Sequence, residues 1–145
     1  MPKFKPKSFP QGIFAPVFLC RQIQPGTFEY TLCKLIDNVL DLSAFDQKYS
    51  NDHTGAPAYD PGALLKVVFL AYSRGITSSR RISEECKENT VFMAISGNSK
   101  PHHTTIAGFV SSTHLEVKNL FLQILLLCDT RGLIGREMFA IDGCK

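Results

Sequence analysis

The chain has 145 residues, of which 44% are hydrophobic and 20% charged, the composition of a globular domain with its own core. Its formal net charge of +3 does not by itself demand nucleic acid, so basic character has to be local. The five cysteines form no C-x-x-C pair, which excludes a zinc ribbon and a thioredoxin motif. No apolar run approaches the roughly 20 residues that span a bilayer, which excludes a membrane anchor. The sequence therefore predicts a cytoplasmic protein.

The first 24 residues are predicted to form an extended arm that is basic and rich in proline. Proline fixes φ and lacks an amide donor, so the four prolines of this arm argue against a helix. Residues 17–23 are expected to be a short extended segment. Two interpretations stay open for residues 1–16, a frayed terminus or an arm that touches DNA or a partner protein.

Two helices are predicted before residue 50. Thr27 follows a Pro-Gly turn and can cap a helix over residues 28–40, where apolar residues fall at helical spacing. Ser43 is predicted to cap a second, short helix that runs to Tyr49. The composition of residues 50–58 indicates a loop.

The central helix is predicted to start at Asp60-Pro61, because aspartate caps a helix well and proline fits its first position. Residues 64–71 are apolar nearly all round, so we expect this helix to be buried. Gly75 is predicted to end it, since glycine readily adopts the left-handed conformation that closes helices.

Capping residues and apolar spacing predict four more helices, over residues 78–87, 91–96, 103–112 and 115–130. Residues 138–141 are predicted to form one short C-terminal strand. The expected fold class is therefore mainly α, a compact helical bundle with an extended N-terminal arm. The last helix is expected to turn six side chains inward, those of Leu120, Phe121, Ile124, Leu125, Leu127 and Cys128.

The helices over 78–87 and 103–112 are predicted to form a helix-turn-helix-like unit that binds DNA. In such a unit one helix crosses the phosphate backbone, and the next presents short polar side chains from its first turn to the major groove. The same pattern fits a solvated face of an ordinary α-helical domain, and that alternative stays open. The candidate DNA-binding residues are Arg74, Arg80, Arg81, Lys87, Lys100, His102, His103, Thr104 and Thr105.

Asp142 is the candidate catalytic residue, at the end of the predicted strand. Two-metal phosphodiester chemistry needs several carboxylates held rigidly around the ions, and one carboxylate cannot do this alone. By itself, a strand that is followed by Asp-Gly is more often part of a hairpin turn. Catalysis by this chain alone is therefore not expected.

Three stretches together resemble the N-terminal part of bacterial insertion-sequence transposases of the DDE class. They read YDPGALLKVVFLAYSRGITSSRRI at 59–82, KPHHTTIAGFV at 100–110 and GLIGREMFAIDGCK at 132–145. The resemblance runs from about residue 22 onward and includes the stretches IQPGTF and AFDQKYSND. It is more specific than any single motif, because many segments follow the family's order.

The resemblance implies a helical DNA-binding domain over residues 25–134 that recognises the terminal inverted repeats of a mobile element in double-stranded DNA. In such proteins a ribonuclease-H-like catalytic domain follows, and residues 135–145 would be its start. Asp142 would be its first catalytic, metal-binding carboxylate, and a complete family member would use Mg²⁺. The fragment itself is expected to need no cofactor and to lie in the bacterial cytoplasm, on the nucleoid when bound.

Two departures from the family pattern bear on function. His102 stands where the family usually has an aspartate, which either strengthens a phosphate contact or marks a decaying copy. The chain also stops shortly after Asp142, which predicts a truncated transposase that binds DNA without cleaving it. The alternatives are a fragment that forms a homo-oligomer or pairs with and inhibits a full-length transposase, and a pseudogene product without function.

Overall fold

The structure, a computed structural model, describes residues 16–46 and 58–135. Within these ranges it is helical, with no strand, which confirms the mainly α prediction. The predicted strand over 138–141 and most of the N-terminal arm lie outside the described residues. The elements are a 3-10 turn η1 (Leu19–Arg21) and the helices α1 (Phe28–Asn38), α2 (Ser43–Asp46), α3 (Pro61–Ser73), α4 (Ser79–Glu88), α5 (Thr90–Ile95), α6 (His103–Ser112) and α7 (His114–Thr130).

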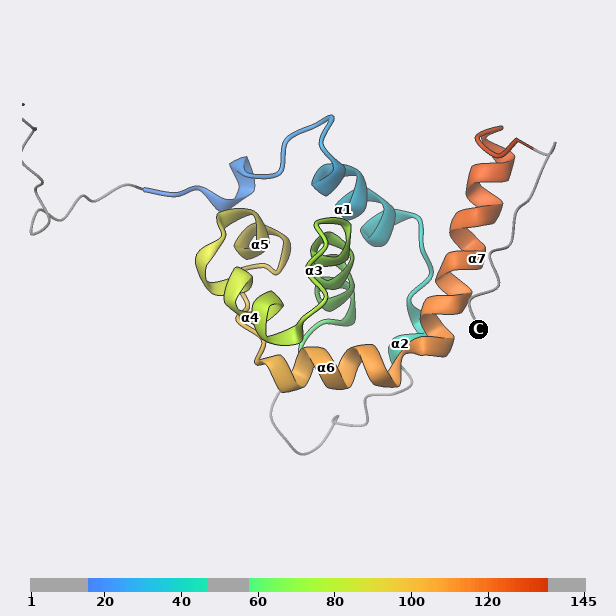
Figure 1. Cartoon of the computed structure of the whole chain (residues 1–145). Coiled ribbons are helices and arrows are strands. Elements are labelled where there is room, and N and C mark those ends of the chain that lie inside the picture. Colours follow the sequence, from blue (N-terminus) through green and yellow to red (C-terminus); the bar gives the residue numbers. More distant parts are fainter. Residues whose placement is uncertain (1–15, 47–57, 136–145) are drawn as a thin grey trace, which may run out of the picture.

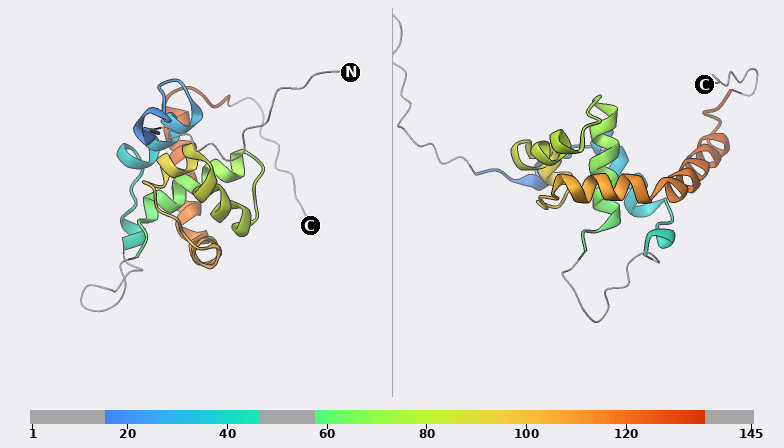
Figure 2. Two further views of the ribbon diagram at one scale, coloured as in Figure 1. Left: turned by 90° about the vertical axis from the view of Figure 1, so that its left-hand side faces the viewer. Right: turned by 60° about the horizontal axis from the view of Figure 1, so that its bottom comes forward.

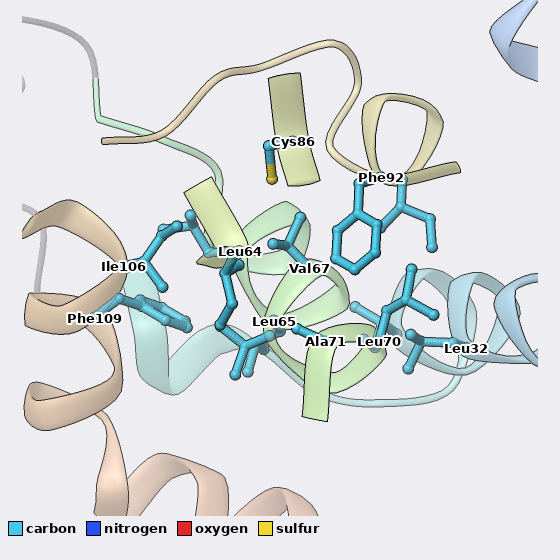
Figure 3. Packing of buried hydrophobic residues seen from close by; sticks show 14 of the residues in the cluster. Leu32, Leu64, Leu65, Val67, Leu70, Ala71, Cys86, Phe92, Ile106 and Phe109 are labelled. Atoms are coloured by element: carbon cyan, nitrogen blue, oxygen red, sulfur yellow. The ribbon is translucent and has the colours of Figure 1, made fainter. Parts of the chain in front are cut away.

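The helices are arranged around α3, as the apolar run in its sequence predicts (Figure 1). Helix α1 lies on one side of α3, α4 and α5 lie on the other, and α6 crosses one end. Side chains from these helices meet α3 in one core, including Leu32 of α1, Phe92 of α5 and Phe109 of α6 (Figure 3). The buried residues of α3 itself are Gly62, Leu64, Leu65, Val67, Val68, Leu70 and Ala71.

Both ends of α3 form as the sequence predicts. The Asp60 carboxylate accepts hydrogen bonds from the amides of Gly62 and Ala63, at 3.4 and 2.9 Å. Gly75 follows the helix with a φ of 75°, where a side chain would be strained, and it turns the chain so that the Ile76 amide donates to the Ala71 carbonyl at 2.8 Å. The central helix is therefore fixed at both termini by local chemistry.

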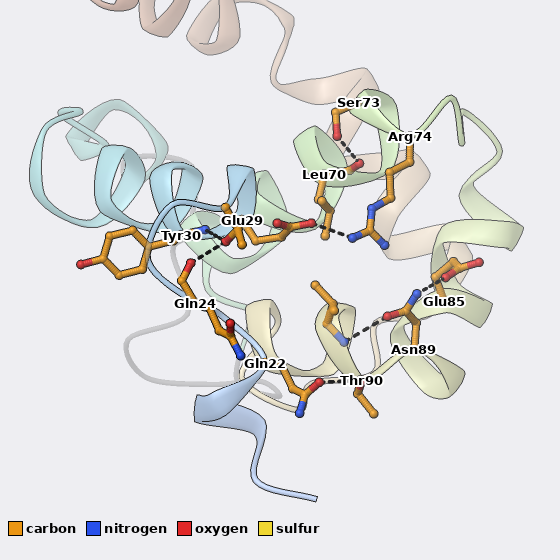
Figure 4. Close-up of polar contacts among 12 residues, drawn as sticks. Gln22, Gln24, Glu29, Tyr30, Leu70, Ser73, Arg74, Glu85, Asn89 and Thr90 are labelled. Carbon is orange, nitrogen blue, oxygen red and sulfur yellow. Dashed lines mark hydrogen bonds and ion pairs between the residues drawn. The ribbon is translucent and has the colours of Figure 1, made fainter.

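The start of α5 differs from the prediction by one residue. Asn89, rather than Thr90, caps this helix, because its Oδ1 accepts a hydrogen bond from the Val91 amide at 3.0 Å. The Thr90 hydroxyl lies instead 3.2 Å from the side-chain oxygen of Gln22, which joins the segment after η1 to α5 (Figure 4). Thr27 caps α1 as predicted.

The prediction of an extended segment over residues 17–23 is wrong. Leu19–Arg21 form the 3-10 turn η1, in which the Arg21 amide donates to the Phe18 carbonyl at 3.1 Å. The Arg21 guanidinium also lies 4.7 Å from the centroid of the Phe18 ring. These contacts between near neighbours favour a turn where the weak alternation of the sequence indicated a strand.

The prediction that six named apolar side chains of α7 all point inward is also wrong. Leu120 is buried, whereas Phe121 is 58% exposed and Leu125 38% exposed. The helix leads away from the bundle (Figure 2), and its stretch from Val117 to Ile124 borders an apolar groove against α1 and α3. None of the helices in the described ranges is long and apolar enough to cross a bilayer.

Candidate nucleic-acid interface

Helices α4 and α6 pack against each other, and a buried hydrogen bond fixes their relative position. The Ser83 hydroxyl of α4 donates to the carbonyl of Pro101, which immediately precedes α6, at 2.8 Å. Ile82 and Cys86 of α4 share the core with Ile106 of α6. The first turn of α6 is therefore held at a defined place beside α4.

The basic residues of α4 lie on two faces of the helix. Arg80 and Lys87 are seven residues apart, so they share a face, and Arg81 is turned about 100° away from Arg80. Neither Arg80 nor Lys87 forms an ion pair with any residue that the structure describes. One face carries Arg80, Glu84 and Lys87, and the neighbouring face carries Arg81, Glu85 and Glu88.

His103, in the first turn of α6, lies close to that first face. Burial lowers the pKa of its imidazole, and the neighbouring His102 and the positive charges of Arg80 and Lys87 lower it further. Its Nδ1 is buried without a hydrogen-bond partner among the described residues, so a protonated ring would bury an unpaired donor. The structure thus brings Arg80, Lys87 and a neutral His103 together.

His102 caps α6, a role that the sequence did not reveal. Its Nδ1 accepts a hydrogen bond from the Thr104 amide at 3.4 Å and lies 2.8 Å from the Thr104 hydroxyl. Its ring also packs edge-on against His103, with the centroids 4.0 Å apart. The imidazole accepts a hydrogen bond from a backbone amide of the first turn, as the carboxylate of an aspartate cap does. It lacks the negative charge that the helix dipole favours at this position.

We expect the substitution His102→Asp to stabilise the fold by about 0.5–1 kcal/mol, because a carboxylate caps more strongly and is attracted by the N-terminus of α6. His102→Ala should destabilise it, since alanine offers no acceptor for the Thr104 amide. Urea denaturation followed by circular dichroism measures both. An aspartate variant less stable than the alanine variant would contradict the assigned role of His102.

Thr104, Thr105 and Lys100 lie around the same turn. Thr104 is exposed and Thr105 half-buried, and both line a shallow pocket of about 260 Å³ with Tyr59. Lys100 is exposed, and its carbonyl lies 3.5 Å from the Tyr59 hydroxyl. We use the name α4–α6 face for seven predicted DNA-binding residues of α4, of the turn before α6 and of its first turn, namely Arg80, Lys87, Lys100, His102, His103, Thr104 and Thr105.

Arg74 is turned away from the other candidates. Its Nη2 lies 2.6 Å from Glu29 Oε1, and its guanidinium lies 5.4 Å from the centroid of the Phe92 ring (Figure 4). The pKa of Glu29 is lowered, first by a backbone hydrogen bond and then by Arg74. Arg74 therefore joins α3 to α1 and α5, a contact that local sequence patterns do not indicate.

The predicted catalytic and metal-binding residue, Asp142, lies outside the described residues. Across residues 16–46 and 58–135, no three His, Cys, Asp or Glu side chains converge in a way that could hold a metal ion.

Comparison with known proteins gives one family. No curated protein and no solved structure matches the chain. Residues 18–112 match the family described as Transposase domain (DUF772), a stretch that runs from η1 through α6 and contains the whole α4–α6 face. Since this match covers well over half of the sequence, the chain belongs to the DUF772 transposase domain family.

Proposed function

We propose that this transposase domain acts in transposition by binding double-stranded DNA at the ends of a mobile element, and that it does so through the α4–α6 face. The observation that carries the proposal is the packing of α4 against α6, which places the exposed Arg80 and Lys87 near enough to His103 for their charges to lower its pKa. Cationic side chains beside the free amides of a helix N-terminus form a favourable place for phosphate oxygens.

The two helices have the roles of a helix-turn-helix-like unit in this proposal. The first turn of α6 enters the major groove, where Thr104 and Thr105 contact base edges. Arg80, Lys87 and Lys100 contact phosphates and set the orientation of the domain on the duplex. The bond between Ser83 and Pro101 supports this arrangement because it ties both helices into one unit.

Fluorescence anisotropy tests the proposal. The duplex probe carries the terminal inverted repeat of an element that encodes a related transposase, and a scrambled duplex of the same composition is the control. Three phosphate contacts give a salt slope of about −2.7, or about a 40-fold loss of affinity between 50 and 200 mM salt. Equal and weak binding to both duplexes would contradict recognition of element ends.

We expect affinity for DNA to rise as the pH is lowered from 7.5 to 6. In the free protein, burial and the nearby charges of Arg80 and Lys87 depress the pKa of His103, so its ring is neutral. Phosphate oxygens would offset those charges and raise this pKa in the complex, so binding takes up a proton and strengthens in acid.

The pH dependence is measured by anisotropy at constant ionic strength, with His103→Gln as the control. Glutamine keeps a polar side chain but does not titrate, so this variant should lose part of the dependence. An affinity of the unsubstituted chain that stays constant across this range would show that His103 does not lie near phosphate in the complex.

A further inference from the structure

The face of α7 that points away from the bundle is apolar. Five large side chains on this face are at least one-third exposed, although α7 is well formed over its whole length. A continuous apolar surface of this kind marks an interaction site in a soluble protein. The exposed fractions are 61% for Leu115, 58% for Phe121, 50% for Leu122, 38% for Leu125 and 66% for Leu126.

Two opposite charges flank the middle of this apolar face. Lys118, Leu122, Leu125 and Asp129 follow the spacing i, i+4, i+7, i+11, so they lie in one line along the helix. The other carboxylate of α7, Glu116, falls on the opposite side of the helix by the same geometry. The outer face of α7 is therefore positive toward its start, apolar in the middle and negative toward its end.

We propose that this face of α7 pairs with α7 of a second copy of the chain, antiparallel about a two-fold axis. Lys118 stands four residues before Leu122, and Leu125 stands four residues before Asp129, so the line is self-complementary when reversed. One register then places Lys118 against Asp129 of the second copy and Leu122 against its Leu125. The two-fold axis makes each of these contacts twice.

The charges select this orientation over a parallel one. In a parallel pair Lys118 would face Lys118 of the second copy and Asp129 would face Asp129, and both contacts repel. Phe121 and Leu126 lie on the two flanks of this line, about 70° to either side of it. In this register Leu122 and Leu125 cover each other, and Phe121 and Leu126 border the contact on either flank.

An apolar groove beside α7 extends the surface that the second copy would cover. The groove has a volume of about 370 Å³ and lies between α1, α3 and α7. Phe28 and Tyr72 line it, and Phe121 belongs both to the groove and to the outer face of α7. The groove therefore borders the proposed contact on its Phe121 flank.

Sedimentation equilibrium of the 145-residue chain over a hundredfold range of concentration tests the pairing. The unsubstituted chain should have twice the monomer mass, and Leu122→Asp should be monomeric with an unchanged helical spectrum, because Leu122 is half exposed and not part of the core. Val17→Asp is the matched control. Val17 is 54% exposed and stands just before η1, a segment that lies on the far side of the bundle from α7 (Figure 1), so this variant should leave the dimer intact.

Charge reversal tests the register. Lys118→Asp and Asp129→Lys each place like charges opposite each other twice, and each should weaken the dimer by about tenfold. The double variant restores opposite charges and should recover most of the affinity. A chain that stays monomeric at every concentration would overturn the pairing, and a dimer indifferent to both single reversals would overturn the antiparallel register.

The proposal does not depend on DNA binding. Helix α7 begins after α6 ends, and none of the residues of its outer face belongs to the α4–α6 face. Monomeric Leu122→Asp should therefore still bind a single element end. If the dimer is absent but this binding persists, only the pairing of α7 is overturned.

Discussion

Replacing Arg80 and Lys87 together with alanine should weaken binding to every DNA sequence by at least about tenfold and reduce the salt slope by about two. Both side chains act on phosphates in the proposed complex, so the loss should not depend on base sequence. Neither residue is buried, so the fold should keep its thermal stability. Anisotropy at three salt concentrations, with specific and scrambled duplexes, measures both quantities.

Arg81→Ala is the control for this experiment. It removes the same charge from the same helix, but Arg81 lies on the face that carries Glu85 and Glu88. We expect its affinity to stay within about twofold of the unsubstituted chain, because a solvated side chain away from the DNA contributes little. If Arg81→Ala weakens binding more than the double variant does, DNA lies against the other face of α4.

Replacing Phe92 with alanine should destabilise the fold by about 3–5 kcal/mol, the usual cost of removing a buried phenylalanine. Phe92 has no exposed surface and belongs to the core that α5 shares with α1 and α3. Its ring also lies under the Arg74 guanidinium, at 5.4 Å. A loss of this size is a large part of the roughly 5–15 kcal/mol that stabilises a typical domain.

Urea denaturation measures this loss, and Phe28→Ala is the matched control. Phe28 is 53% exposed on α1, so the same substitution should cost about 1 kcal/mol or less. DNA binding by Phe92→Ala should fall only in proportion to the unfolded fraction. A cost below about 1 kcal/mol for Phe92→Ala would mean that α5 is not part of the core.

The sequence predicted the helices well because their limits depend on neighbouring residues. Asp60 caps α3 through amides two and three residues ahead, and Gly75 ends it through its own backbone conformation. Apolar spacing likewise identified the buried stripes of α4 and α6, at Ile82, Cys86 and Ile106. Such interactions can be read within one or two turns of a helix.

The candidate site was predicted only in part, because some of its features depend on distant residues. The contact between Arg74 and Glu29 joins positions 45 apart in the chain, so no local pattern separates Arg74 from the basic residues of α4. Helix geometry alone predicts that Arg81 and Arg80 lie on different faces of α4. Which of these faces lies beside α6 is known only from the structure. Asp142 lies outside the described residues and stays a prediction.

The exposed face of α7 likewise could not be predicted from local sequence patterns. Spacing marks Phe121 and Leu125 as apolar positions of an amphipathic helix, but spacing does not say whether another helix covers them. In the described structure nothing covers them fully, since they keep 58% and 38% of their surface exposed. Their partner, on our proposal, belongs to a second molecule.

The hydrogen bond from Ser83 to the Pro101 carbonyl bears on the thermodynamics of recognition. It holds the first turn of α6 in place before any DNA is present, so association does not have to order this segment. Binding by a preorganised surface loses little conformational entropy, and its heat-capacity change reflects the contact area alone. In the proposed complex, the domain would therefore bind DNA without first having to order this turn of α6.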